Sequence, residues 1–390
     1  MTPFTFNTTK SIVFRNGAAA ELAETAGGLL GQSVLLVTDP GLRALGLCDP
    51  AIDSLERAGH AVTVYDKVEA DPSRATLMAA TQAAREAGVT GVVGFGGGSS
   101  LDIAKLAALL AGSGEDIDAA WGVGNAKGPR LPLVLVPTTA GTGSEVTPVS
   151  IITVENDEKR GVSSPVILPD LAILDAELTA GLPAHITAAT GVDAMVHAIE
   201  AYASKSANNN PLSRMIAREA LVLLGANIEE AVFNGRNMDA RAAMLLGSML
   251  AGQAFANSPV AAVHALAYPI GGTFHVPHGL SNALVLPHVL RFNAAETVNG
   301  SHRLYAELAP CAFPDLGGEG GSQATCAAFI ERLASLSERL GLQTKLRDVG
   351  IGEEHLAQMA ADSMKQTRLL VNNPRAVSEA DALAIYRAAW

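Results

Sequence analysis

The repeat of hydrophobic and polar positions along the chain changes near residue 181. Before it, short runs of β-branched and other apolar residues alternate with Ala-rich stretches whose apolar positions recur at helical spacing. Such alternation is typical of an α/β fold. The runs that predict strands are 33–38, 61–65, 91–95 and 131–136. The stretches that predict helices are 49–58, 73–87 and 101–110.

After residue 181 the strand signals fade, and Ala, Leu and Met recur at helical spacing to the end of the chain. The Leu182-Pro183 pair is a turn signal at the point of change. We therefore predict an α/β domain over residues 1–181 and an all-helical domain over residues 182–390.

One segment of the second half, 242–290, contains no Asp, Glu, Lys or Arg. Its length would allow a membrane hairpin. However, it also contains Gln253, Asn257, Ser258 and four histidines, which a lipid-facing segment rarely carries. We therefore predict a pair of buried helices whose polar groups face a site.

Composition places the chain among folded, enzyme-sized proteins. Hydrophobic residues make up 48% of its 390 residues and charged residues 17%, which is too apolar for intrinsic disorder. The net charge of −12 disfavours binding to nucleic acid or to an anionic membrane. Three widely spaced cysteines offer no disulfide framework, and the first residues resemble no secretory signal, so a cytoplasmic protein is expected.

Two loops that follow predicted strands have the composition of phosphate-binding turns. In GFGGGSSLDIAK, Gly96, Gly97 and Gly98 lead into a helix, and backbone N–H groups near Ser99 can bind a pyrophosphate. In LPLVLVPTTAGTGSE, hydroxyl groups and glycines follow the next strand. Because ligands bind at the carboxyl edge of parallel sheets, we predict a nucleotide there. A tight turn without a ligand is the alternative for the glycine loop.

The order of these motifs differs from the usual dinucleotide fingerprint, in which an acidic ribose ligand follows the glycine loop by about 20 residues. Here Asp39 ends an earlier strand and precedes the loop by more than 50 residues. Its carboxylate could accept hydrogen bonds from an adenosine ribose and repel a 2′-phosphate, which favours NAD over NADP. A simple Asp-Pro turn explains the residue equally well.

A candidate metal site combines four residues from two parts of the chain. In TGVDAMVHAIEAY, Asp193 and His197 are four positions apart in a helical stretch, so their side chains project from one face. His264 and His278 follow in the charge-free segment. One carboxylate and three imidazoles suit Zn(II) or another first-row metal such as Fe(II). Histidines that serve only as buried core residues are the alternative.

Turn signals around these histidines predict how they meet. Ser258-Pro259 has the residues of a helix N-terminus, so a helix that carries His264 is expected to begin there. Tyr268-Pro269 and Gly271-Gly272 are expected to end it. The following loop would then fold His278 back toward His264.

Four motifs together resemble those of the iron-containing, group III alcohol dehydrogenases. They are GFGGGSSLDIAK, PTTAGTGSEVTP, DAMVHAIEAY and AVHALAYPIGGTFHVPHGLSNALVLP, in this order over about 39–292. The resemblance implies an α/β nucleotide-binding domain followed by an all-helical metal- and substrate-binding domain, an architecture shared with dehydroquinate synthase. It implies Fe(II), or alternatively Zn(II), held by Asp193, His197, His264 and His278. It also implies NAD contacts from Asp39, Gly96, Gly97, Gly98, Ser99, Asp102, Thr138, Thr139, Thr147 and Lys159.

One position departs from the family pattern. Most members have a second histidine four residues after the ligand that corresponds to His264, and it is often assigned to proton transfer; here the residue is Tyr268. Tyrosine can donate and accept a proton, but its ordinary pKa near 10 makes it a poorer base at neutral pH. Tyr268 and the ligand His278 are therefore the expected catalytic residues, with His275 as an alternative relay.

We predict a metal-dependent oxidoreductase that transfers hydride between a small alcohol and NAD to give an aldehyde or ketone. The alternatives are a keto-acid reductase of the maleylacetate type, a glycerol-type polyol dehydrogenase, a lyase resembling dehydroquinate synthase, and a metal- and nucleotide-binding protein without turnover. The few charges in the 242–290 segment favour a weakly polar substrate. The resemblance implies a homodimer or a higher homo-oligomer.

Overall fold

The computed structural model describes residues 3–155, 158–295, 300–317 and 321–390. The chain divides into two compact units, one formed by residues 7–181 and the other by residues 182–390 together with the residues through Phe6. Two hydrogen bonds tie this first segment to the helical unit, because the Thr5 N–H donates to Asn208 Oδ1 and the Asn208 amide donates to the Thr5 carbonyl, both at 2.9 Å. The pattern of the sequence alone predicts these residues in the α/β domain instead.

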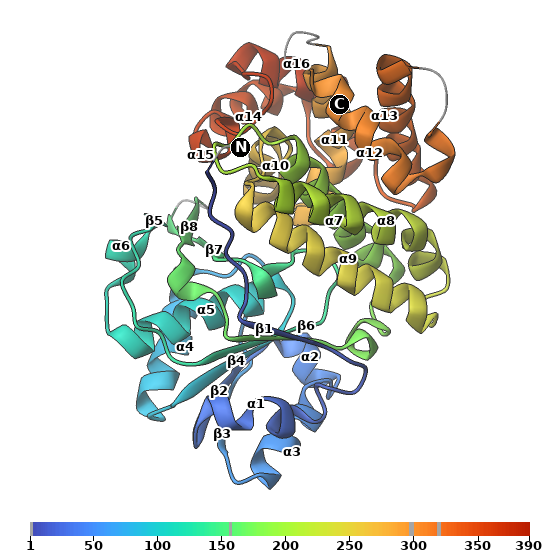
Figure 1. Ribbon diagram of the computed structural model, residues 1–390. Helices are drawn as coiled ribbons and strands as arrows, with labels where there is room; N and C mark the ends of the chain where they lie inside the picture. The colour runs from blue at the N-terminus through green and yellow to red at the C-terminus, as the bar shows by residue number, and fades with distance from the viewer. Residues whose placement is uncertain (1–2, 156–157, 296–299, 318–320) are drawn as a thin grey trace. The chain divides into compact units, whose positions relative to one another are not determined.

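The α/β unit is built on a six-stranded sheet whose paired strands all run parallel (Figure 1). In their order across the sheet, the strands are β1 (Ser11–Phe14), β9 (Leu171–Leu174), β6 (Leu133–Pro137), β4 (Gly91–Gly96), β2 (Ser33–Val37) and β3 (Ala61–Tyr65). The four predicted strands correspond to β2, β3, β4 and β6. Strands β1 and β9, which pair with each other along one edge, are not predicted by the sequence pattern.

Helices cover both faces of this sheet. Because successive side chains of a strand point to opposite faces, Leu35 and Val37 of β2 pack with α4 and α5, whereas Val34 and Leu36 pack with α1 and α3. The helices are α1 (Leu22–Leu30), α2 (Pro40–Ala44), α3 (Asp49–Arg57), α4 (Arg74–Glu86), α5 (Gly98–Ser113) and α6 (Ile117–Ala120). Three of them, α3, α4 and α5, correspond to the predicted helices.

A second, three-stranded sheet was not predicted. It consists of β5 (Gly122–Val123), β8 (Lys159–Ser163) and β7 (Val149–Thr153), and β8 runs antiparallel to β7. Strand β8 begins with two charged residues and β5 has only two residues, so neither has the apolar run of a buried strand. Short 3-10 helices complete the unit: η1 (Ser144–Val146), η3 (Pro165–Ile167) and η4 (Ala176–Thr179).

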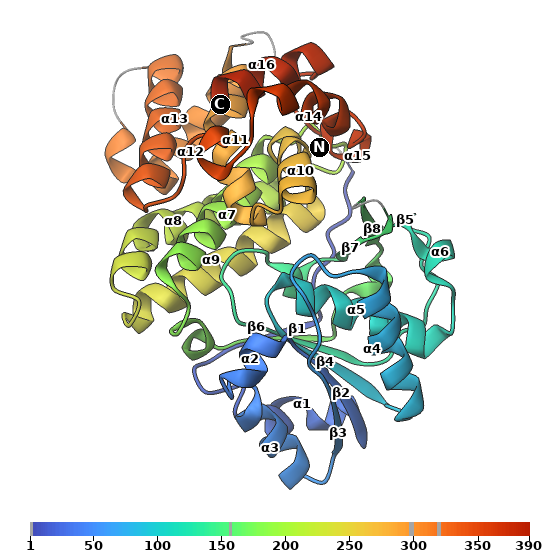
Figure 2. The same cartoon turned by 180° about the vertical axis from the view of Figure 1, so that it is seen from behind.

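The second unit is helical over its described residues, as predicted (Figure 2). Its α-helices are α7 (Ala184–Ala203), α8 (Pro211–Phe233), α9 (Met238–Asn257), α10 (Ala262–Phe274), α11 (His278–Ala294), α12 (Ser301–Ala312), α13 (Gly321–Arg339), α14 (Leu356–Ser363), α15 (Thr367–Leu370) and α16 (Glu379–Ala389). The 3-10 helices are η5 (Pro314–Leu316), η6 (Leu346–Val349) and η7 (Glu353–His355). Helices α7, α8 and α9 pack against one another, and α10 and α11 pack beside them.

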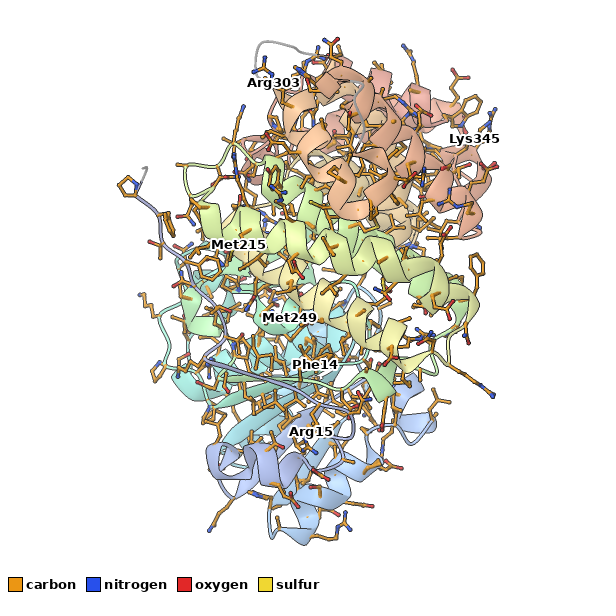
Figure 3. The ribbon with its side chains drawn as sticks, turned by 45° about the vertical axis from the view of Figure 1, so that its right-hand side comes forward. Phe14, Arg15, Met215, Met249, Arg303 and Lys345 are labelled. Carbon is orange, nitrogen blue, oxygen red and sulfur yellow. The ribbon has the colours of Figure 1, made fainter. Side chains whose placement is uncertain are left out.

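The charge-free segment contributes to three helices, α9, α10 and α11, rather than to the predicted pair. Most of its side chains are buried in the helical unit. Among the described helices, none is long and apolar enough to cross a membrane. Arg303 and Lys345 are charged residues at the surface of this unit (Figure 3), whereas Asp193, Glu200 and Arg241 are buried in it.

Helix α10 has different ends from those predicted. Ser258 ends α9 instead of beginning α10, and its hydroxyl donates to the Ala201 carbonyl at 2.7 Å. The helix begins at Ala262 and continues through Pro269 to Phe274. Proline in a helix interior costs a hydrogen bond and causes a steric clash, but almost every residue from Ala262 to Ile270 is buried, so packing maintains the helix.

Candidate metal centre and nucleotide-binding edge

Three helices of the second unit bring the four predicted metal ligands together. Asp193 and His197 lie one turn apart on α7, His264 lies in the first turn of α10, and His278 is the first residue of α11. One potential ligand atom from each residue lies within 4.8 Å of those of the others. The first three side chains are buried, whereas the His278 side chain is 43% exposed. The set is therefore accessible from the side of His278.

Glu200 orients one of these histidines. Its Oε2 lies 2.7 Å from His264 Nδ1, and the side chains of both residues are 4% exposed. Because a carboxylate accepts the hydrogen of Nδ1, the Nε2 lone pair of His264 is left for a cation. Glu200 Oε1 also accepts the Val263 N–H at 2.7 Å. One carboxylate on α7 thus caps α10 and sets the tautomer of its histidine.

Asn282 contacts the same set one turn beyond His278. Its amide nitrogen donates to Asp193 Oδ1 at 2.6 Å and lies 3.2 Å from His264 Nε2 and 3.3 Å from His278 Nε2. Its buried Oδ1 has no hydrogen-bond partner among the described residues. This amide therefore connects three of the four candidate ligands.

The electrostatics of the set favour an ionised carboxylate. Burial alone would raise the pKa of Asp193, but His197, His278, His264 and the Asn282 amide hold its pKa below the ordinary value. The ring of His197 stacks on that of His264 with the centroids 4.7 Å apart. A carboxylate with three imidazoles matches the donors that bind first-row divalent cations, so the set fits a metal.

Gly279 allows α11 to approach α7 closely enough to complete the set. A Cβ atom at this position would meet the backbone carbonyl of Ala189 and would lie 3.3 Å from the Asp193 Cβ. Only a residue without a side chain permits this contact. The glycine that follows His278 therefore has a packing role.

Tyr268 lies beside the accessible edge of the set. It is one turn beyond His264 on α10, and its ring centroid is 6.3 Å from that of His278. The guanidinium of Arg368 donates to the Tyr268 hydroxyl oxygen at 3.3 Å. His275, the alternative relay, is an exposed residue in the left-handed conformation that ends α10. Within the described residues, the metal set does not include His275.

In the α/β unit, most of the predicted nucleotide contacts gather at one edge of the sheet. Strands β2, β4 and β6 are neighbours, so Asp39, the 96–99 loop and the 138–147 loop follow their carboxyl ends side by side. A Cβ at Gly98 would lie 2.9 Å from Thr142 Cγ2, which shows how closely the two loops approach. This arrangement suits a ligand that spans adjacent strands.

A buried lysine that the sequence motifs do not point to ties the 138–147 loop to α5. Lys105 on α5 donates to Ser144 Oγ at 2.7 Å, Thr147 Oγ1 at 3.1 Å and the Val149 carbonyl at 2.7 Å. Asp102 accepts the Ser144 hydroxyl at 2.7 Å and the Ile151 N–H at 2.8 Å. The predicted contacts Asp102 and Thr147 are thus bound within the protein and shape the loops.

Burial controls the ionisation of this cluster. It lowers the pKa of Lys105 to about 8 and raises the pKa of the neighbouring Glu145 to about 7. Each charged form is disfavoured because the surrounding protein solvates it less well than water does.

Two other predicted contacts have partners of their own. Asp39 Oδ1 accepts the Leu42 N–H at 3.0 Å and caps α2. Lys159 lies on β8, where it pairs with Asp71 at 2.6 Å and donates to Thr153 Oγ1 at 2.9 Å. Lys159 is thus on the small sheet and not on a loop that follows β2, β4 or β6.

A pocket of about 850 Å³ lies along α8. Tyr202, Arg214, Met215, Arg218 and Cys311 are among its lining residues. It contains none of the predicted site residues.

The sequence analysis also missed Glu200, Asn282 and Arg368. Glu200 and Asn282 lie inside the quoted motifs, three residues after His197 and four after His278, where helical spacing puts them on the same helix faces. That spacing was the available signal. No comparable signal pointed to Arg368, which lies 100 positions from Tyr268.

Comparisons with known proteins agree along the whole chain. The iron-containing alcohol dehydrogenase family matches residues 9–176, and the C-terminal part of the Fe-containing alcohol dehydrogenase family matches residues 187–390. Long-chain-alcohol dehydrogenase 1 of Geobacillus thermodenitrificans is 40% identical over 380 residues, which cover 96% of this chain and 93% of that protein. Sulfoacetaldehyde reductase of Bilophila wadsworthia is 36% identical over 393 residues, which cover 99% of this chain and 98% of that protein. The crystal structure of a 1,3-propanediol oxidoreductase superposes with a TM-score of 0.94 at 34% identity and covers 100% of both chains.

The fold and these relatives define an oxidoreductase that interconverts alcohols and carbonyl compounds. The chain belongs to the iron-containing alcohol dehydrogenase family. The predicted family and fold class are therefore confirmed. The relatives differ in their substrates, from long-chain alcohols to sulfoacetaldehyde.

Proposed function

We propose that this protein is an NAD-dependent alcohol dehydrogenase that holds Fe(II), or alternatively Zn(II), on Asp193, His197, His264 and His278. The observation that supports this proposal most directly is that one potential ligand atom from each of these four residues lies within 4.8 Å of those of the others, in a member of this family. When bound, the metal supplies Lewis acidity toward the substrate oxygen, and the nicotinamide supplies a hydride acceptor.

The residues of the chain prepare the site for these groups. Glu200 keeps the hydrogen of His264 on Nδ1, so that Nε2 faces the cation. The Asn282 amide restrains Asp193. Substrate approaches from the side of His278, because the side chain of this ligand is 43% exposed and the other three are buried.

Tyr268 is proposed to move the proton. Because its oxygen accepts a hydrogen bond from Arg368, its own hydrogen remains available to a substrate oxygen. In oxidation the Tyr268 oxygen would take the proton of the substrate hydroxyl while its own hydrogen passes to solvent, and in reduction both transfers would run in reverse. A Tyr268→Phe variant is expected to lose rate and to change the pH dependence of kcat; an unchanged rate and profile would remove Tyr268 from the mechanism.

The nucleotide is proposed to bind at the edge formed by β2, β4 and β6. The neighbouring positions of Asp39 and the two loops support this proposal. The remaining Asp39 oxygen is expected to favour the ribose of NAD over the 2′-phosphate of NADP. Comparison of the two cofactors in the wild type and in Asp39→Gly tests this preference.

The central test is reconstitution of activity. Protein freed of metal is loaded anaerobically with Fe(II) or Zn(II) and assayed by NADH absorbance against alcohols, diols and hydroxy acids. We expect NADH formation that depends on the metal and is abolished by His264→Ala. The matched control is His288→Ala on α11, which removes a histidine outside the metal set.

Nucleotide binding without NADH formation from any alcohol, with either metal, would contradict the proposed activity. Equal losses in His264→Ala and His288→Ala would contradict the assigned ligand set.

We further propose that the protein is a homodimer or a higher homo-oligomer. Several large apolar side chains on the outer side of α8 support this, among them Met215, which is 61% exposed (Figure 3). Light scattering of the purified protein tests it, and a monomeric mass would contradict it.

A further inference from the structure

The segment that follows α14 carries three cations and no carboxylate between residues 365 and 375. Lys365 pairs with Asp362 at 2.6 Å, and Arg375 lies over the ring of Phe292, 3.8 Å from its centroid. The third cation, Arg368, is exposed, and no carboxylate among the described residues pairs with it. Arg368 is thus a guanidinium with unused donors.

The fold brings this guanidinium to Tyr268, the side chain beside the metal set. Leu369 is buried, and the Asn372 amide donates both to the Arg368 carbonyl at 3.0 Å and to the Val260 carbonyl, just before α10, at 3.1 Å. These contacts hold the segment of α15 against α10. From there Arg368 reaches the hydroxyl of Tyr268 at 3.3 Å. Helices α10 and α15 lie side by side in both views (Figures 1 and 2).

Arg368 contacts Tyr268, which lies in the 242–290 segment that has no charged residue of its own. Among the described residues, three charged side chains form hydrogen bonds with the 242–290 segment. Asp193 accepts from Asn282, Glu200 accepts from the Val263 N–H and bonds His264, and Arg368 donates to Tyr268. The two carboxylates serve the metal set. The guanidinium is bound to a side chain that lies beside this set.

Three side chains, His278, Tyr268 and Arg368, form a chain of contacts at the accessible side of the metal set. His278 is the exposed member of the metal set, the centroid of the Tyr268 ring lies 6.3 Å from that of His278, and Arg368 donates to the Tyr268 hydroxyl. A short substrate whose hydroxyl or carbonyl lies at the metal set would therefore extend past Tyr268 toward Arg368.

We propose that Arg368, supported by Tyr268, binds an anionic group at the far end of the substrate, so that the enzyme acts on short hydroxy or oxo acids. A guanidinium offers two parallel donors to the paired oxygens of a carboxylate or sulfonate, and such charge-assisted bonds are strong. This inference rests on the proposed dehydrogenase function and defines the class of its substrate. It replaces the weakly polar substrate expected from the charge-free segment.

The test compares pairs of alcohols with the same carbon number. Glycolate, 3-hydroxypropanoate and 4-hydroxybutyrate are each measured against the neutral alcohol, and isethionate supplies the sulfonate. In Arg368→Gln we expect the ratio of kcat/KM for the anionic to the neutral member to fall about tenfold or more, mainly through KM. Arg368→Lys should retain part of the ratio, because it keeps the charge but loses the planar donors.

Lys365→Gln is the matched control, because it removes the same charge three positions earlier from an exposed residue. A loss limited to carboxylates or to sulfonates would support the subsite and identify its anion. An unchanged ratio in Arg368→Gln, or an equal fall in Lys365→Gln, would overturn the proposal while leaving the dehydrogenase activity intact.

A binding measurement decides the proposal without turnover. Calorimetry with butyrate and with ethanesulfonate should detect binding to the metal-loaded wild type and its loss in Arg368→Gln. Failure of the proposed function has a different signature, namely the absence of NADH from every alcohol in the panel. Equal binding of both anions to wild type and Arg368→Gln would overturn the subsite even then.

Discussion

His264 can bind a cation through Nε2 only while Nδ1 keeps its hydrogen, and this condition depends on Glu200. The carboxylate lies 2.7 Å from Nδ1 with both side chains buried, so no water competes for the position. Carboxylates placed in this way raise the basicity of a metal-bound imidazole and fix its orientation. Glu200 is therefore a positioning residue for the proposed metal.

Glu200→Gln is expected to weaken metal binding by about tenfold to a hundredfold, because the amide holds the imidazole less strongly. Competition with a chromogenic chelator measures the metal dissociation constant directly. Glu338→Gln on α13 is the control, since it makes the same change at an exposed position. An affinity equal to that of the control would show that Glu200 serves only to cap α10.

Some site residues can be predicted from their local sequence, whereas the roles of others depend on partners far away in the chain. Asp193, His197, His264 and His278 could be predicted because residue type and local spacing suggest a metal set. The roles of Lys105 and Arg368 depend on partners 39 and 100 positions away, and no local pattern encodes these contacts. The departure at Tyr268 was visible in the sequence, but its guanidinium partner was not.

The ends of helices also depend on contacts that local sequence does not reveal. The cap of α10 comes from Glu200 on another helix, which satisfies the Val263 N–H. Ser258, the predicted cap, instead donates to a carbonyl of α7. Rules for local capping assume that a helix is capped by its own flanking residues, so they misplace a start that a distant side chain supplies.

The packing of α11 on α7 provides a direct test of the metal set. Gly279→Ala would place a methyl group against the Ala189 carbonyl and push α11 away. We expect a loss of about 1 to 3 kcal/mol in stability, as for other overpacked contacts, together with weaker metal binding. Denaturant unfolding and chelator competition measure the two effects.

Gly28→Ala on α1 is the matched control for this substitution. A Cβ there meets nothing within 4 Å, so the change should be neutral or stabilising. Equal stability of Gly279→Ala and the wild type would contradict the close approach of α11 to α7.

The stability of the protein is expected to depend on pH through Glu145, which lies in the short helix η1. Because burial raises the pKa of Glu145 from 4.5 to about 7, its contribution to stability is present in full below pH 4.5 and is lost as pH rises through 7. The loss is about 3 kcal/mol at most. Lys105, with its pKa of about 8, keeps its proton throughout this window.

Glu145→Gln should remove much of this pH dependence, since an amide does not ionise. The melting temperature of the variant is expected to change less than that of the wild type between pH 4.5 and 7. Parallel curves for the two proteins would show that Glu145 does not titrate in this range.

Fold class could be predicted because each half of the chain has one dominant periodicity. The central strands β2, β4 and β6 are buried apolar runs and were predicted. The edge strand β1 is partly exposed and the β8 strand is rich in polar residues, so neither has the periodicity of a buried strand. Sheet order, which brings Asp39 beside the glycine loop, also lay beyond any local pattern.

All four candidate ligands belong to the helical unit, so removal of the metal should affect that unit alone. We expect a chelator to increase hydrogen exchange in α7, α10 and α11 and to leave β4, β6 and α5 unchanged. Hydrogen exchange with mass spectrometry measures this peptide by peptide. Equal deprotection of the α/β unit would show that the metal stabilises both units.

The hydrogen bonds between Thr5 and Asn208 have a consequence for the order of events during synthesis. The two residues are 203 positions apart, and every strand of the six-stranded sheet lies between them. The sheet can close as soon as β9 has joined β1. The segment through Phe6 precedes the sheet in the chain but has to wait for the helices that follow, so it is among the last segments to reach its native partners.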